Sequence, residues 1–77
     1  MPIAFLVRGD YIQLDQLLKA TGLCPSGGHA HAEIGAGQVL VDGSIEVRKR
    51  AKLRAGQQVR YGGETVDLMT ESIPGGA

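Results

Sequence analysis

"QVLVDGSIEV", residues 38–47, decides the fold because it predicts two short strands joined by a turn at Asp42 and Gly43. Apolar residues alternate with others on both sides of the turn, which is the period of a strand with one buried face. These residues are Val39, Val41, Ile45 and Val47. A two-residue turn would set the two apolar faces out of phase. We therefore expect a three-residue turn that holds Gly43 in the left-handed conformation and pairs Val39 with Ile45.

A second hairpin is expected towards the C-terminal end. "QQVRY" (57–61) and "ETVDLM" (64–69) flank a Gly62-Gly63 dipeptide, and a two-residue turn there places Val59 opposite Val66. At the other end of the chain, "IAFLV" (3–7) alternates in the same way and predicts a first strand. The sheet should therefore contain four to five strands.

Two helices are expected between the first strand and the first hairpin. "YIQLDQLLKATG" (11–22) places three leucines on one helical face and ends in a glycine, which predicts a helix from Leu14 to Thr21. In "SGGHAHAEIGAG" (26–37), Ser26 can cap a second helix, and Gly35 or Gly37 can end it.

Gly27 and Gly28 weaken the start of the second helix, because each costs about 1 kcal/mol relative to alanine. Two explanations remain open. The glycines can allow the second helix to pack closely on the first, or they can allow the backbone of an anionic ligand to approach the free amides at the helix start.

The cations are concentrated in one window. Six of the eight lysines and arginines fall within residues 46–60, in a chain of zero formal net charge, and no acid lies between Glu46 and Glu64. Clustered lysine and arginine bind phosphate backbones by releasing condensed counterions, and arginine adds bidentate geometry. Alternatively, a highly charged connection can simply stay solvated and keep neighbouring strand edges from aggregating. The exclusion of acids favours a phosphate partner, because a pure cation patch repels itself.

Catalysis and metal binding have little support in the sequence. His29 and His31 stand two apart, so on a helix they project about 200° from each other, whereas helical metal pairs usually stand three or four apart. Their alternative roles are as exposed polar residues or as donors to phosphate or ribose. Cys24 could be activated by a helix start with His29 as base, but a buried structural cysteine is far commoner. We expect no enzyme, no metal and no cofactor.

Length and composition set the remaining limits. The chain has 77 residues, one cysteine and no long apolar run, so we expect one small soluble domain in the cytoplasm, with no membrane segment. There is no tryptophan, one phenylalanine and two tyrosines. So few rings argue against a protein that stacks a run of single-stranded bases.

The ordered set "YIQLDQLLKATGL", "SGGHAHAEI" and "GQVLVDGSIEVRKRAKLRAGQQV" resembles the alpha-L RNA-binding domain, the module named from the fourth small-subunit ribosomal protein. More closely, it is similar to the small stand-alone bacterial members of the YbcJ type. The resemblance covers roughly residues 11–68. It implies an RNA surface across the two helices and the adjoining turn. Many relatives on the ribosome carry basic residues where this chain has Gln13 and residues 27–31, so the later cations should carry more of the binding.

Together these arguments predict an α+β fold in which two short helices pack on a small, mostly antiparallel sheet. Residues 1–69 should form the single domain and residues 70–77 a flexible tail. We expect a non-catalytic module that grips structured RNA, ribosomal or transfer RNA, on its own or on a ribosomal particle. The alternative is an adaptor whose basic patch docks on an acidic protein. The resemblance, together with the cluster of cations, implies that the RNA-binding residues are Gln13, Lys19, Gly27, Gly28, His29, His31, Arg48, Lys49, Arg50, Lys52 and Arg54.

Overall fold

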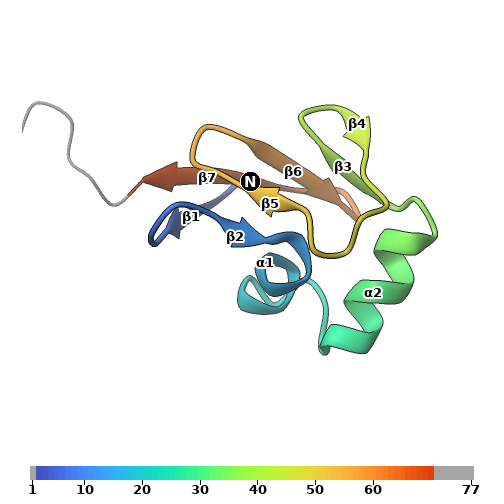
Figure 1. Cartoon of the computed structure of the whole chain (residues 1–77). Helices are drawn as coiled ribbons and strands as arrows, with labels where there is room; N and C mark the ends of the chain where they lie inside the picture. The colour runs from blue at the N-terminus through green and yellow to red at the C-terminus, as the bar shows by residue number, and fades with distance from the viewer. Residues whose placement is uncertain (1, 71–77) are drawn as a thin grey trace, which may run out of the picture.

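The computed structural model describes residues 2–70 and contains two helices on one side of a five-stranded sheet (Figure 1). The elements are β1 (Ile3–Val7), β2 (Ile12–Gln13), α1 (Leu14–Ala20), α2 (Gly27–Gly35), β3 (Val39–Val41), β4 (Ser44–Ile45), β5 (Lys52–Leu53), β6 (Gln58–Tyr61) and β7 (Glu64–Thr70). The main sheet has the strand order β1-β7-β6-β3-β4. Only the β1–β7 pair is parallel, so the predicted α+β fold with a mostly antiparallel sheet is confirmed.

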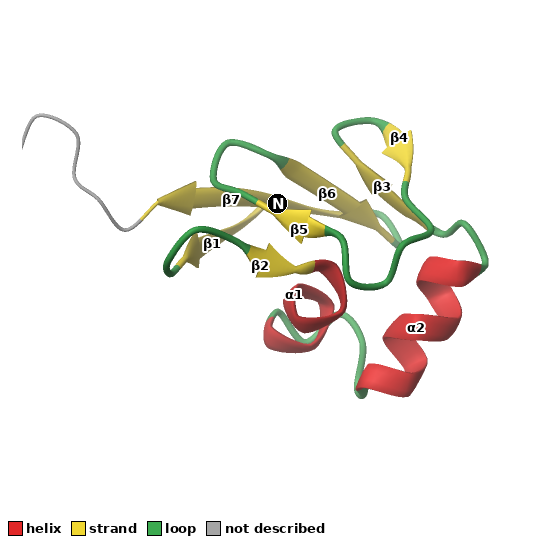
Figure 2. Ribbon diagram, in the orientation of Figure 1, coloured by secondary structure: helices red, strands yellow, loops and turns green. Residues whose placement is uncertain are grey.

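A second, two-stranded sheet was not predicted. β2 pairs with β5, and Ile12 lies opposite Leu53 while Gln13 lies opposite Lys52. This small sheet lies between the main sheet and α1 in Figure 2. Two-residue strands are too short to produce a period in the sequence, and only the tertiary contact reveals them.

The register of the first hairpin differs from the prediction. Val41 lies opposite Ser44, and Leu40 lies opposite Ile45, so the turn has two residues and the expected pairing of Val39 with Ile45 is wrong. The predicted left-handed Gly43 is confirmed, but Asp42 is left-handed as well, with φ values of 84° and 50°. These are the signs of a type I′ turn, which matches the twist of the strands.

The error has a physical cause. The predicted register assumed that both strands bury one apolar face, yet Ile45 is 64% and Val47 58% exposed. Asp42 tolerates its positive φ and also uses its carboxylate, which accepts hydrogen bonds from the Gln58 amide at 2.9 Å and from Gln57 Nε2 at 3.1 Å. The second hairpin follows the prediction, with Val59 opposite Val66.

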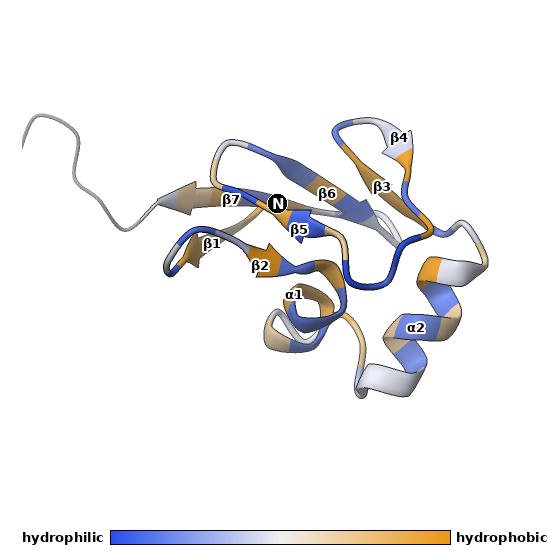
Figure 3. Ribbon diagram, viewed as in Figure 1, coloured by the Kyte–Doolittle hydropathy of each residue, from blue (hydrophilic) through white to orange (hydrophobic). Residues whose placement is uncertain are grey.

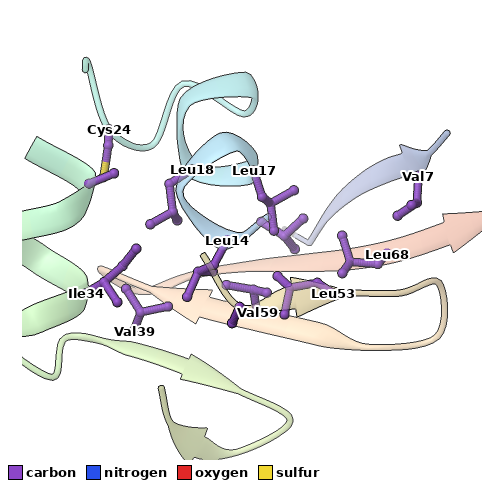
Figure 4. Packing of buried hydrophobic residues seen from close by; sticks show 13 residues of the cluster. Val7, Leu14, Leu17, Leu18, Cys24, Ile34, Val39, Leu53, Val59 and Leu68 are labelled. Carbon is purple, nitrogen blue, oxygen red and sulfur yellow. The ribbon is translucent and has the colours of Figure 1, made fainter. Parts of the chain in front are cut away.

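The helices bring their apolar faces together over the sheet (Figure 4). The core positions expected from the spacing are buried, and the fully buried residues include Leu14, Leu17, Leu18, Ile34, Val39 and Val59. Ser26 caps α2 as predicted, because its Oγ accepts the His29 amide at 3.1 Å. α1 ends one residue earlier than expected, with Thr21 as its cap, and Gly22 follows with a φ of 78°.

The ends of the domain are described only in part. β7 includes Thr70, and the rest of the tail expected over 70–77 lies outside the described residues. None of the helices within residues 2–70 is long and apolar enough to cross a membrane.

Replacing Gly43 tests the turn. Gly43→Val places a β-branched residue at a φ of 84°, and we expect the free energy of unfolding to fall by about 1 to 2 kcal/mol. Ser44→Val, at the neighbouring exposed strand position, should leave it nearly unchanged. Urea denaturation measures both variants, and equal effects would contradict the turn assignment.

Candidate functional site

The basic segment, residues 48–54, is held in place by backbone hydrogen bonds and by two buried apolar side chains. Ala51 and Leu53 are buried in the core, while the cations between and beside them are exposed. The Leu14 amide donates to the Ala51 carbonyl at 2.9 Å, and the Asp15 amide donates to the Lys49 carbonyl at 3.0 Å. The first amides of a helix have no partner within it, so the segment satisfies two of them. Its cations are therefore displayed from a fixed backbone.

Two open grooves follow this segment. The larger has a volume of 680 Å³ and lies against α2, and its lining residues are His31, Gly35, Val47, Arg48, Lys49 and Arg50. The smaller has a volume of 420 Å³ and is lined by Arg48, Arg50, Ala51 and Lys52. Figure 3 shows a hydrophilic run in the loop between β4 and β5, with apolar colouring on either side of it. The structure thus brings together His31 and four of the predicted cations.

Asp15 lies beneath the larger groove as a buried carboxylate, only 6% exposed. Its Oδ2 is 2.9 Å from His31 Nε2, and its Oδ1 accepts the Gln16 amide at 2.8 Å. The pair joins the start of α1 to the middle of α2. It fixes the orientation of the His31 ring, which lines the groove, whereas the Asp15 carboxylate stays buried behind it.

Arg48 is a paired cation. Its Nε and Nη2 donate to the two carboxylate oxygens of Glu46 at 3.0 and 2.9 Å, and its backbone amide donates to Glu46 Oε2 at 3.0 Å. The hydrogen bonds from Arg48 lower the pKa of Glu46 from 4.5 to about 2. The local charge of Arg48 is therefore compensated. Lys49, Arg50 and Lys52 have no carboxylate partner among the salt bridges described within residues 2–70.

The two histidines lie on opposite flanks of α2, as their spacing predicted. His31 faces the groove, whereas His29 Nε2 lies 3.5 Å from Glu33 Oε1, which also accepts the Tyr61 hydroxyl at 2.9 Å. The hydrogen bond to Glu33 raises the pKa of Tyr61 to about 12. The structure does not bring His29 to the basic segment.

Gly27 and Gly28 do not need to be glycines for packing. A Cβ on Gly27 would lie 3.9 Å from Lys19 Cδ, and one on Gly28 would lie 4.0 Å from Ser26 Oγ, both ordinary contacts. Ala30 and Ile34 pack inward as expected. The explanation by close helix packing is therefore wrong, and the approach of a ligand remains a hypothesis. Lys19 and Gly27 are neighbours at this end of α2, whereas Gln13 lies opposite Lys52.

Cys24 is a buried residue of the core, 1% exposed, as its commoner role predicted. Burial raises the pKa of its thiol, which opposes a role as nucleophile. Within residues 2–70 no group of three histidine, cysteine or acidic side chains is placed to hold a metal ion.

Tyr11, which was not among the predicted site residues, is an exposed residue beside the basic segment. Lys52 Nζ lies 5.0 Å from the centre of the Tyr11 ring. Arg54 Nη1 donates to the Asp10 carbonyl at 3.3 Å, next to Tyr11 in the chain. The pairing of β2 with β5 brings Tyr11 and Lys52 together, and no periodicity in the sequence reveals this pairing.

A match to a protein family fits this arrangement. The model of the S4 domain matches residues 5–69, which is most of the chain. The chain belongs to the S4 domain family. This S4 domain is 44% identical over 64 residues to the Escherichia coli protein named "Putative RNA-binding protein YbcJ". The match covers 83% of this chain and 91% of YbcJ.

The solution structure of YbcJ from Escherichia coli shares the fold of this S4 domain. The TM-score is 0.65 at 40% identity, and the match covers 88% of this chain and 85% of the other. That structure is described as revealing an alfaL motif involved in RNA binding. The tyrosine–tRNA ligase of Ralstonia nicotianae is 41% identical over 58 residues, which is 75% of this chain but 15% of the ligase. This S4 domain therefore resembles only one part of that enzyme.

The pairing of Glu46 with Arg48 predicts an acid titration. In the Arg48→Gln variant we expect the pKa of Glu46 to return from about 2 towards 4.5. Because the native pKa lies below the ordinary one, the contribution of Glu46 to stability is complete above about pH 4.5 and is lost as the pH falls towards 2. NMR titration of the carboxyl carbon measures this pKa, and Arg60→Gln should leave it unchanged. A wild-type midpoint near 4.5 would contradict the pairing.

Gly28→Ala tests whether the glycines serve stability. The added methyl group has room, and alanine is the better helix former, so the free energy of unfolding should rise by about 0.5 to 1 kcal/mol. Thermal and urea unfolding measure the change. A loss of stability would show that packing requires the glycine after all.

Proposed function

We propose that this S4 domain binds structured RNA without catalysis, with the phosphates of the RNA lying in the grooves along the basic segment. The observation that carries the proposal is the display of Lys49, Arg50 and Lys52 from a backbone tied to the start of α1. Membership of the S4 domain family and the likeness to YbcJ support RNA as the partner. The RNA is held chiefly by its backbone and shape, because the site offers cations more than base-reading groups.

The contributions of the individual residues should differ. Lys49, Arg50 and Lys52 contribute full charges. Arg48 contributes less than its position suggests, because Glu46 compensates its charge. A second set of contact residues lies at the N-terminal end of α2 and extends the RNA surface there. It consists of Lys19, Gly27, Gly28 and His29.

Ribosomal or transfer RNA is the class of structured RNA that we propose. Part of a tyrosine–tRNA ligase is similar to this chain, and the name of that enzyme specifies a transfer RNA. The alternative is an acidic protein partner, which the same cations could bind. A competition experiment separates the two: a folded transfer RNA should displace labelled RNA at far lower concentration than poly-glutamate at matched salt.

A comparison of two arginines tests the phosphate contact. Each engaged phosphate contributes about −0.7 to −0.9 to the slope of log affinity against log salt. Arg50→Gln should weaken the binding of folded transfer RNA and make this slope shallower by that amount. Arg60→Gln removes the same charge from an exposed position on β6 that lines neither groove, and should leave the slope unchanged. Fluorescence anisotropy at several salt concentrations measures the slopes.

Two outcomes would count against the site. Equal effects of Arg50→Gln and Arg60→Gln would mean that only overall charge matters. The double variant with Glu46→Gln and Arg48→Gln removes a neutral pair, so it should change the slope less than Arg50→Gln does. A larger change would place Arg48, and not its neighbours, at the centre of binding.

A further inference from the structure

The β2–β5 sheet has an outer face that no expected site includes as a whole. Side chains alternate along a strand, so Ile12 and Leu53, which lie opposite each other, turn towards the core. Their neighbours along each chain take the opposite face. These neighbours are Tyr11, Gln13, Lys52 and Arg54. An aromatic ring thus shares one surface with an amide and two cations.

The ring of Tyr11 is open to a ligand. It is 39% exposed, and within residues 2–70 no other aromatic side chain is equally open. Phe5 packs against the core, and Tyr61 is half-buried and donates to Glu33. The ammonium of Lys52 lies over the Tyr11 ring at 5.0 Å, and Arg54 binds the neighbouring carbonyl of Asp10. The ring therefore lies beside the cations of the basic segment.

Lys52 connects this ring to the site of the RNA backbone. The same side chain lines the 420 Å³ groove together with Arg48 and Arg50. A phosphate backbone that lies in this groove reaches Lys52, and the next nucleotide along the strand is then beside Tyr11.

We propose that Tyr11 stacks one unpaired base of the RNA whose phosphates occupy the groove, an inference that rests on the proposed function. A base that remains paired within a duplex has no free face for the ring. The preferred RNA is therefore a helix interrupted by an unpaired nucleotide. One exposed ring serves one base, which agrees with the small number of aromatic residues in the chain. On binding, the base takes the ring face and the Lys52 ammonium moves to the adjacent phosphate.

Two RNA hairpins with the same stem test this inference. One stem is uninterrupted, and the other carries a single unpaired 2-aminopurine. The wild-type protein should bind the interrupted stem about tenfold more tightly and quench the 2-aminopurine fluorescence. Tyr11→Phe keeps the ring and should keep both effects. Tyr11→Leu should lose both effects while its affinity for the uninterrupted stem stays the same, with folding checked by circular dichroism.

Lys52→Gln provides the matched comparison, because it should weaken both RNAs by the same factor. The inference is overturned if Tyr11→Leu keeps the tenfold preference and the quenching. It is also overturned if Tyr11→Leu weakens both RNAs equally, since the ring would then only position Lys52. In either case the proposed function of RNA binding would not be contradicted. If the wild-type protein binds neither RNA at low salt, the proposed function fails as well.

Discussion

Two backbone hydrogen bonds organise the candidate site, because they join the start of α1 to the basic segment. The amides of Leu14 and Asp15 donate to the carbonyls of Ala51 and Lys49, at 2.9 and 3.0 Å. A helix start needs acceptors for its free amides, and a loop of repelling cations needs an anchor. The basic segment supplies the acceptors for the helix amides, and the helix start anchors the backbone of the basic segment. The burial of Ala51 and Leu53 then decides which side chains of the segment face outward.

The same contact explains why the site has mixed chemistry. The β2–β5 pairing brings Tyr11 beside Lys52, and the start of α1 places Asp15 under His31. One short connection therefore borders an aromatic ring on one side and an acid–histidine pair on the other. A surface of this kind can offer different contacts to the backbone and to the base of one nucleotide.

Much of the fold could be predicted from local patterns, and the failures have a common cause. The leucine spacing and the Ser26 cap predicted the helices because both signals lie within one element. The register at Asp42 was predicted wrongly because alternation does not reveal that Ile45 faces solvent. The cluster of cations was evident, but the compensation of Arg48 by Glu46 depends on side-chain and backbone hydrogen bonds that the spacing does not reveal. Tyr11 was missed because its neighbour Lys52 is distant in the sequence.

The parallel pairing of β1 with β7 has a consequence for the order in which the molecule assembles. Among the described residues, β1 lies at an edge of the main sheet and pairs only with β7, with Ile3 opposite Val66. During synthesis, β1 leaves the ribosome before β7, so this pairing cannot form until Glu64–Thr70 has emerged. The helices and the hairpins can form earlier from contacts that are closer in sequence. The β1–β7 pair thus joins the two ends of the described residues, and it is the strand pair with the greatest separation in sequence.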